Sequence, residues 1–254
     1  VSLNSPTDGN WNTSKTVNFD FNASDNYVVR NCSVWHNDAT WGEQQSNTSD
    51  ITNGSNNQIQ TTFTNDGNFS WNVLCLDMSN RSAFAAANYT IKIDSTYPQI
   101  IIENPTNTSY ANNDVWMNVT MVEIHKDKCY YDLDGTNYTL TNSSGKWNNY
   151  STDLAHGLHN VIFWCNDSAG NLNHSSTVYF TVNHCVCGET ITTSCTLYED
   201  ISTTGTCITF GANNIYLNCS GHLIDGDDGS GDYGVYSASR TSVEVRDCNF
   251  TDFG

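Results

Sequence analysis

The sequence predicts an all-β fold, and three observations support this prediction. Apolar and polar residues alternate with period two in short runs such as Val17–Phe21 and Val115–Met121, which is typical of half-buried strands. Clusters of Gly, Asn and Asp separate these runs and supply residues suited to turns. No segment shows an apolar stripe at helical spacing, so we expect no substantial helix.

Length and cysteine content indicate several small domains in an oxidising compartment. The 254 residues are too many for one ordinary sandwich and fit two or three domains. The ten cysteines include one close pair, Cys185 and Cys187, and no Cys-x-x-Cys motif. This pattern favours disulfides over a zinc site.

Charge and hydropathy exclude two classes of partner. The chain has 27 acidic and 9 basic residues and a net charge of −18, which argues against binding to nucleic acid or to an anionic membrane by charge. No apolar run approaches the roughly 20 residues of a membrane-spanning helix. We therefore expect no membrane span in this chain.

The first 183 residues contain two copies of one module. Asn-Ser-Pro-Thr near the start of the first copy recurs as Asn-Pro-Thr in the second, and each copy ends on an alternating strand. A glycine lies eight residues before a cysteine in both copies, at Gly67 and Gly157. The predicted boundaries are 1–97 and 98–183. Six to eight short strands in about 90 residues are typical of a β-sandwich.

One turn of the second copy points to a family. Trp164-Cys-Asn-Asp-Ser-Ala-Gly-Asn171 resembles the C-x-D-x-A-G-N turn of immunoglobulin-like modules repeated in bacterial and archaeal surface proteins. The resemblance is weaker in the first copy, where Met-Ser-Asn follows Asp77. In that topology the cysteine-bearing strands are neighbours within one sheet. The resemblance therefore implies cross-strand disulfides between Cys32 and Cys75 and between Cys129 and Cys165. In both turns the aspartate, Asp77 or Asp167, should accept backbone hydrogen bonds.

Residues 184–254 follow a different pattern of shorter strands. Cys187-Gly-Glu-Thr-Ile-Thr192 and residues 211–226 resemble the entry coils of pectate-lyase-like, NosD-like right-handed parallel β-helices. Only two or three coils are visible. We therefore expect the polypeptide to continue past Gly254 or a neighbouring subunit to cover that end, with a short capped domain as the alternative. The pairing of six cysteines stays open: Cys185, Cys187, Cys195, Cys207, Cys219 and Cys248.

Sites for N-linked glycosylation are twice as frequent as chance predicts. With 35 Asn and 56 Ser plus Thr, random order gives about eight Asn-x-Ser/Thr sequons. The sequence has 17, and each occupied site must face solvent in an exported protein. The predicted sites are Asn12, Asn22, Asn31, Asn47, Asn53, Asn68, Asn80, Asn88, Asn107, Asn118, Asn137, Asn142, Asn149, Asn166, Asn173, Asn218 and Asn249.

Two groups of polar residues could bind a metal, and in both the structural interpretation is favoured. Four carboxylates lie in the segment 225–232, but the spacing departs from an EF-hand loop, which favours a solvated turn. His156 and His159 with His174 form the densest group of histidines and lie on turns. We predict no metal site.

Other candidates for chemistry are also weak. Tyr130, Tyr131, Trp147 and Trp164 could stack on a sugar, although aromatic residues on strands usually pack in a core. HExxH, GxSxG and P-loop motifs are absent. The third segment offers only Arg240 and Arg246 as basic residues, too few to assign the proton-abstracting role of pectate-lyase-type enzymes. We predict no catalytic residue, and no cofactor apart from covalent N-linked glycans.

These observations favour a structural glycoprotein outside the cell. We expect a cell-surface protein that forms or decorates an extracellular filament, sheath or surface layer, with an archaeal source favoured by the sequon density. Its expected partners are further copies of the same chain, bound through strand edges or the β-helix end, and an extracellular carbohydrate is a second candidate. The alternatives are a polysaccharide-degrading β-helix enzyme with active coils beyond residue 254, or a lectin-like adhesin.

Overall fold

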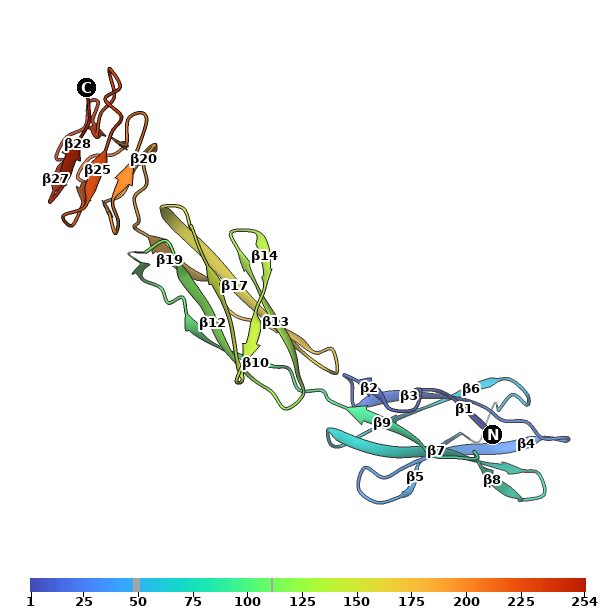
Figure 1. The fold of residues 1–254 in the computed structure, drawn as a ribbon. Coiled ribbons are helices and arrows are strands. Elements are labelled where there is room, and N and C mark those ends of the chain that lie inside the picture. The colour runs from blue at the N-terminus through green and yellow to red at the C-terminus, as the bar shows by residue number, and fades with distance from the viewer. Residues whose placement is uncertain (48–50, 111) are drawn as a thin grey trace. The chain divides into compact units, whose positions relative to one another are not determined.

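All regular structure among the described residues is β-structure. The computed structural model describes residues 1–47, 51–110 and 112–254 and contains strands β1 to β28 (Figure 1). None of these described residues forms a helix long and apolar enough to cross a membrane. The chain forms two compact units: residues 1–98 with the segments 123–127 and 166–173, and the remainder of the chain. The division into three domains expected from the sequence, at 1–97, 98–183 and 184–254, stays a prediction.

The first sandwich pairs a three-stranded sheet with a six-stranded sheet. The small sheet has the order β1-β3-β6, and the large sheet has the order β2-β9-β7-β4-β5 with β8 added to β7. Alternation along β3 buries Val17, Phe19 and Phe21 and leaves their neighbours outside, as a half-buried strand requires. The strands are β1 (Ser2–Ser5), β2 (Asn10–Asn12), β3 (Thr16–Asn22), β4 (Val29–His36), β5 (Gly42–Asn47), β6 (Asn56–Thr62), β7 (Gly67–Asp77), β8 (Ser82–Phe84) and β9 (Tyr89–Ile93).

The second sandwich repeats this plan with a four-stranded sheet opposite a six-stranded sheet. The orders are β10-β12-β16-β15 and β11-β19-β17-β13-β14, with β18 added to β17. Its core includes Met117, Tyr131, Phe163 and Phe180, all fully buried. The strands are β10 (Gln99–Asn104), β11 (Ser109–Tyr110), β12 (Val115–Val122), β13 (Lys126–Leu133), β14 (Thr136–Thr139), β15 (Thr141–Ser143), β16 (Lys146–Ser151), β17 (Gly157–Asp167), β18 (Leu172–His174) and β19 (Val178–Val182).

The strand orders support the predicted duplication. In both large sheets a short first strand pairs in parallel with the last strand of the module, β2 with β9 and β11 with β19. The remaining strands follow in matching order, and a short extra strand pairs beside the cysteine-bearing strand in each copy. The prolines at the two starts, Pro6 and Pro105, both follow cis peptide bonds. The two copies therefore share one immunoglobulin-like topology.

The C-terminal segment forms three coils of parallel β-structure. Strands one coil apart lie in register, such as Cys195 opposite Leu217 and Leu217 opposite Val245, so apolar side chains stack in ladders. The sheet orders are β20-β23-β26, β21-β24-β27 and β22-β25-β28. These stacked parallel sheets form a short segment like a parallel β-helix, as the sequence predicts. The strands are β20 (Glu189–Ile191), β21 (Cys195–Thr196), β22 (Ile201–Ser202), β23 (Ile208–Phe210), β24 (Tyr216–Asn218), β25 (Leu223–Asp225), β26 (Val235–Tyr236), β27 (Glu244–Arg246) and β28 (Asn249–Thr251).

Candidate functional site

Each sandwich contains one disulfide between neighbouring strands of its large sheet. Cys32 on β4 lies directly opposite Cys75 on β7, and the two are bonded. Cys129 on β13 is bonded to Cys165 on β17, its neighbour in the sheet order. These are the pairs that the immunoglobulin-like resemblance implies. All four cysteines are buried, so the bonds are shielded from solvent.

The coils contain the other three disulfides, whose pairing the sequence left open. Cys185 is bonded to Cys195, Cys187 to Cys207, and Cys219 to Cys248. The last of these pairs joins residues 29 positions apart, about one coil. Every cysteine of the chain is paired, and such complete pairing is typical of proteins outside the cytosol.

The sequon asparagines all reach the surface. Of the 17, nine are exposed, eight are half-buried and none is buried. A glycan on a fully buried asparagine would have no room in the folded chain, so burial by itself excludes none of the 17 positions. The nine exposed asparagines are Asn22, Asn53, Asn68, Asn80, Asn88, Asn107, Asn137, Asn142 and Asn249.

Asn166 is the sequon asparagine least suited to carry sugar in the folded state. Its Nδ2 donates to Asp127 Oδ2 at 2.7 Å and to the carbonyl oxygen of Asp167 at 3.1 Å. Both amide hydrogens are therefore engaged, whereas N-glycosylation replaces one of them. Its Oδ1 is also buried. A glycan at this position requires that one of the two hydrogen bonds is lost.

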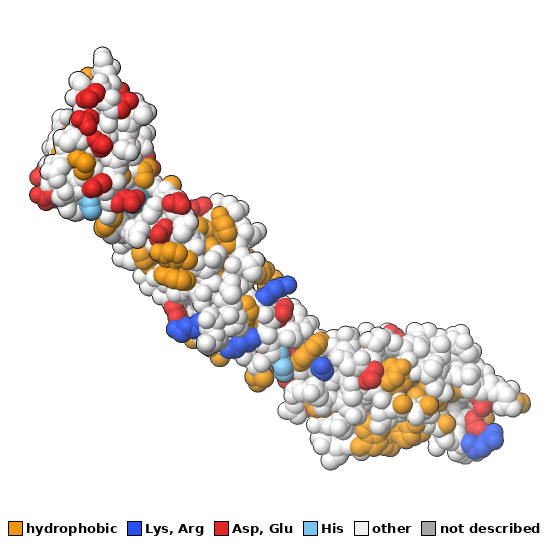
Figure 2. Space-filling model, in the orientation of Figure 1, with side chains coloured by type: hydrophobic (Ala, Val, Ile, Leu, Met, Phe, Trp, Pro, Cys, Tyr) orange, Lys and Arg blue, Asp and Glu red, His pale blue; other side chains and the backbone are white. Residues whose placement is uncertain are grey.

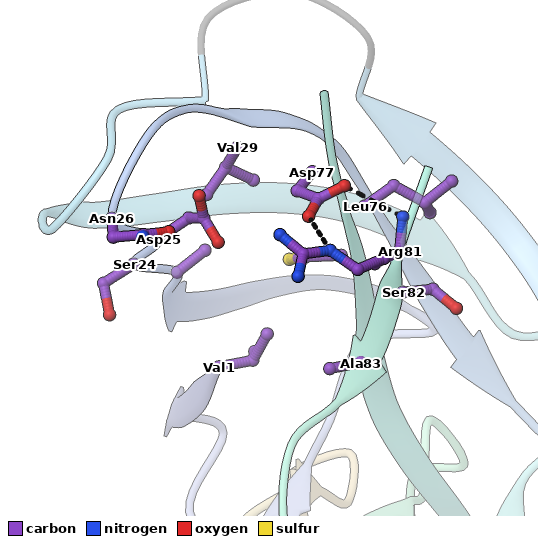
Figure 3. A pocket seen from close by; sticks show the side chains of 12 residues that line it. Val1, Ser24, Asp25, Asn26, Val29, Leu76, Asp77, Arg81, Ser82 and Ala83 are labelled. Carbon is purple, nitrogen blue, oxygen red and sulfur yellow. Dashed lines mark hydrogen bonds and ion pairs between the residues drawn. The ribbon is translucent and has the colours of Figure 1, made fainter. Parts of the chain in front are cut away.

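A hollow of about 320 Å³ lies at one end of the first sandwich, lined in part by Val1, Asp25, Asp77 and Arg81 (Figure 3). Arg81 Nε donates to Asp77 Oδ2 at 2.8 Å, and the backbone N–H of Ser79 donates to Oδ1 at 2.7 Å. The backbone N–H of Arg81, its guanidinium and the Ser79 N–H hold the pKa of the Asp77 carboxyl below its ordinary value. The carboxylate thus stays ionised near neutral pH and is poorly suited to transfer protons.

The histidines singled out in the sequence have separate hydrogen-bond partners. His159 Nδ1 lies 2.6 Å from Asp134 Oδ2, and His156 Nε2 lies 2.8 Å from Thr193 Oγ1. His174 Nδ1 lies 2.8 Å from the carbonyl oxygen of Ser175, and its ring packs against the Trp164 ring with centroids 4.7 Å apart. They do not converge on one point, so among the described residues they form no metal site.

The acidic loop of the coils also forms no cluster of three metal-ligating groups among the described residues. Asp225 Oδ1 accepts a hydrogen bond from Thr251, and Asp227 Oδ1 accepts one from the N–H of Gly229. The charge of Asp228 raises the pKa of Asp252, and burial and Asp225 add to this effect. Figure 2 shows acidic side chains gathered over the segment that carries this loop.

Arg246, which lies on strand β27 of the coils, is already paired. Arg246 Nη2 donates to Glu244 Oε2 at 2.6 Å, and its guanidinium lies over the Tyr216 ring at 4.2 Å. Hydrogen bonding to Glu244 raises the pKa of Arg246. A guanidinium held in this way is a poor proton acceptor, which leaves the enzyme alternative without a base at this residue.

The aromatic residues divide between core and surface. Tyr131 and Trp147 are buried. Tyr130 and Trp164 are half-buried, and their rings are nearly parallel with centroids 6.4 Å apart. A second aromatic group, which the sequence does not predict, is formed by Trp35, Trp41 and Phe84, whose rings contact one another on the first sandwich. Apolar side chains are visible on that unit in Figure 2. Trp41 is followed by Gly42 and Glu43, and this part of the sequence has no pattern that would predict an exposed aromatic side chain.

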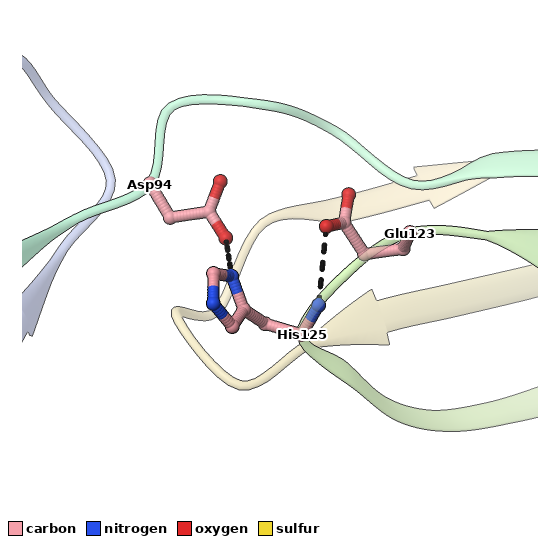
Figure 4. Close-up of side chains that lie close together, drawn as sticks. All are labelled: Asp94, Glu123 and His125. Carbon is pink, nitrogen blue, oxygen red and sulfur yellow. Dashed lines mark hydrogen bonds and ion pairs between the residues drawn. The ribbon is translucent and has the colours of Figure 1, made fainter. Parts of the chain in front are cut away.

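One group of three side chains able to ligate a metal is present among the described residues: Asp94, Glu123 and His125 (Figure 4). All three belong to the first compact unit. Asp94 follows β9, and the other two lie between β12 and β13. None of the three belongs to a sequence motif with metal-ligand spacing.

Comparisons with known proteins add a likeness in architecture. No family model matches the sequence, and no curated protein matches it. Among solved structures, the chain is similar to the fibronectin(III)-like modules of Clostridium thermocellum CbhA, with a TM-score of 0.45, 13% identity, and coverage of 71% of this chain and 93% of that chain. It is also similar to the FN1–FN3 domains of chicken CNTN1, with a TM-score of 0.36, 11% identity, and coverage of 71% and 66%.

The class of the protein follows from its own strand order and disulfides. It is an all-β chain with two immunoglobulin-like or fibronectin(III)-like sandwiches, followed by stacked parallel strands like the start of a β-helix. Sandwich modules with buried disulfides are typical of extracellular modular proteins.

Proposed function

We propose that this chain is a non-catalytic, N-glycosylated structural protein of the cell surface, which forms or decorates a filament, sheath or surface layer. The observation that supports this proposal best is the exposure of the sequon asparagines. The sequence has 17 of them, about twice the number that chance predicts, and none of them is buried. Glycans on most of them would shield the strands and supply solubility that charged residues, 14% of the chain, supply only sparsely.

The disulfides support a mechanical role for the same chain. Each sandwich bond closes a loop of 43 or 36 residues between adjacent strands, and the coils have three more bonds in 71 residues. Crosslinks of this kind limit local unfolding because the strands that they join cannot separate far. Such resistance suits a protein exposed to extracellular proteases and to tension.

We further propose that copies of the chain associate through the coils. Apolar side chains of the third coil, including Val235, Val245, Phe250 and Phe253, surround a hollow of about 370 Å³. Val245 and Phe250 are exposed. A coil from a second copy would bury these side chains and extend the parallel sheets, at about 25 cal/mol per Å² of apolar area. An archaeal source remains the favoured one.

Glycopeptide mapping of the protein from its native source tests the glycoprotein proposal. We expect sugar on most of the 17 sequons, with the nine exposed asparagines occupied most fully and Asn166 least. An intact mass close to the 28.1 kDa of the bare chain would contradict the proposal. Electron microscopy of the native surface tests assembly separately, and a monomer with no lattice or fibre would end that part.

A further inference from the structure

Three potential metal ligands from two separate segments meet within the first compact unit. The ligand atoms of Asp94, Glu123 and His125 all lie within 4.8 Å of one another. His125 Nδ1 is 2.8 Å from Asp94 Oδ2. Figure 4 shows the three side chains close together, with the Glu123 carboxylate hydrogen-bonded to the backbone N–H of His125. Two ligand atoms bound at about 2.0–2.2 Å from one ion lie at most about 4.4 Å apart, so binding a metal ion would draw the three groups closer together.

The charges of this group are not balanced by a basic side chain. Asp94 is 3% exposed, and the only ion pair recorded for either carboxylate among the described residues is with His125. Two carboxylates at such close range repel each other, and burial weakens the solvent screening that would relieve this. A divalent cation neutralises both, whereas a protonated imidazole neutralises one.

Backbone hydrogen bonds hold the ligands in place. Asp94 Oδ1 accepts from the N–H of Thr96 at 3.1 Å, and Glu123 Oε1 accepts from the N–H of His125 at 3.2 Å. The His125 ring packs edge-on against Trp11 with centroids 4.7 Å apart, and its carbonyl oxygen accepts from Ser168 N–H at 2.7 Å. Ligands fixed in this way lose little freedom when an ion binds.

A neighbouring side chain has an unsatisfied buried oxygen. Asn171 is 2% exposed, and its Nδ2 donates to the carbonyl oxygen of Asp94 and to Asp167 Oδ2, both at 2.8 Å. Because both of these partners are acceptors, the amide orientation is fixed and Oδ1 is the atom left over. That Oδ1 is buried and has no partner in the described part of the chain. The hydrogen bonds from Asn171 Nδ2 tie the buried turn at Asp167 to the backbone of Asp94, which helps to hold that ligand in place.

We propose that Asp94, Glu123 and His125 bind a divalent transition-metal cation of the zinc type. Calcium and magnesium prefer all-oxygen sites, whereas imidazole nitrogen with carboxylate oxygens suits Zn²⁺ and its first-row neighbours. Three protein ligands leave room for water as the fourth. The ion would fix the segment after β9 to the segment between β12 and β13 and so act as a structural staple.

Isothermal titration of the full-length, metal-stripped glycoprotein with Zn²⁺ tests this site. We expect one Zn²⁺ per chain, and Co²⁺ in its place should give visible absorption bands of a nitrogen- and oxygen-ligated ion. His125→Gln and Glu123→Gln should each weaken binding by at least about tenfold, since even outer-shell partners of metal ligands have effects of that size. Zn²⁺ should raise the thermal unfolding temperature of the unaltered protein more than that of His125→Gln or Glu123→Gln, because it binds the folded state and binds these variants more weakly.

His222→Gln is the matched control. His222 Nδ1 lies 3.2 Å from Asp200 Oδ1, so it forms a comparable histidine–aspartate pair without a second carboxylate. Its removal should leave the Zn²⁺ affinity unchanged. Equal affinity in the unaltered protein, His125→Gln and Glu123→Gln would overturn the proposal, as would a site that takes Ca²⁺ in preference to Zn²⁺. Unfolding temperatures without metal establish that each variant is folded, and neither result depends on whether the protein forms filaments.

Discussion

The two sandwiches contain the same turn with different partners. In both, the cysteine-bearing strand β7 or β17 ends on an aspartate whose Oδ1 accepts two backbone N–H groups of the turn: those of Ser79 and Arg81 for Asp77, and those of Gly170 and Asn171 for Asp167. Both turns also close with a hydrogen bond from the aspartate N–H to the carbonyl oxygen four residues later.

The difference lies in the residue that follows the turn. In the first sandwich this residue is Arg81, whose side chain is 77% exposed and pairs only with Asp77 among the contacts recorded for it. In the second it is Asn171, which is buried and donates to both Asp167 and the Asp94 carbonyl oxygen. The aspartate and its amides thus define the turn, while one residue decides whether it stays at the surface or is anchored to another segment.

The largest effect should come from the disulfides, where the two sandwiches ought to behave alike. Removing Cys32 and Cys75, or Cys129 and Cys165, by alanine substitution should cost about 4 kcal/mol in the chain-entropy model. The loops of 43 and 36 residues differ so little that the two losses should agree within about 0.2 kcal/mol. Scanning calorimetry of the full chain should show the altered sandwich melting roughly 20 °C lower. Losses that differ twofold would show that the modules are not energetically equivalent.

The aspartates of the turn should separate the two copies. Asp167→Ala removes the acceptor of the buried N–H of Asn171 and one of the two acceptors of its side-chain amide, as well as the acceptor of the Gly170 N–H. We expect a loss of about 3 kcal/mol. Asp77→Ala should lose less than half as much, because water reaches the exposed amides of Ser79 and Arg81. Thermal unfolding of both variants measures the difference.

Asp167→Asn is the matched control for the buried turn. It retains an acceptor oxygen for the backbone N–H groups of Gly170 and Asn171 but puts a donor nitrogen opposite Asn171 Nδ2, so it should recover only part of the loss. Equal destabilisation by Asp77→Ala and Asp167→Ala would contradict the claim that burial distinguishes the two turns.

The fourth position of the turn should be interchangeable between the copies. Asn80 has φ 62° and Gly170 has φ 99°, values that Gly and Asn adopt more readily than other residues. A side chain at Gly170 would meet no atom within 4 Å, so only backbone strain matters. Gly170→Ala should cost about 1–2 kcal/mol, and Gly170→Asn clearly less. Unfolding temperatures that rank asparagine below alanine would show that another constraint acts there.

The sequence predicts the strands and the duplication because both depend on local patterns. Alternation along β3 and β12 assigns each side chain to one face, and the glycine-to-cysteine spacing repeats in both copies. The same alternation distinguishes buried Tyr131 from half-buried Tyr130, although the sequence alone does not state which face is the core. The turn at Asp167 has a motif of its own, so its hydrogen bonds could be predicted as well.

Contacts between distant segments could not be predicted in the same way. Cys187 pairs with Cys207, and Cys219 with Cys248, because parallel coils stack in a particular register. That register depends on loop lengths that the sequence does not reveal. Asp94 and His125 are 31 residues apart and belong to no motif with metal-ligand spacing. Their proximity results from the tertiary structure, and no periodicity in the sequence could have indicated it.

The smallest expected effect is a difference in the pH dependence of stability, and it should have opposite signs at Asp77 and Asp252. The backbone N–H of Arg81, helped by its side chain and by Ser79, lowers the pKa of Asp77 below its ordinary value. A lowered pKa in the folded state stabilises the protein above the unfolded value of about 3.9, and that contribution is lost as the pH falls through the folded pKa. The Asp228 charge, with burial, raises the pKa of Asp252. The contribution of Asp252 to stability is therefore greatest below about pH 3.9 and is lost as the pH rises through the folded pKa.

Asp77→Asn should therefore lower the unfolding temperature at pH 6 and leave it unchanged near pH 2. Asp252→Asn should raise the unfolding temperature at pH 6. Unfolding temperatures measured between these pH values in low salt would decide the matter, and shifts of the same sign in both variants would show that hydrogen bonding in the turn does not control the titration of Asp77.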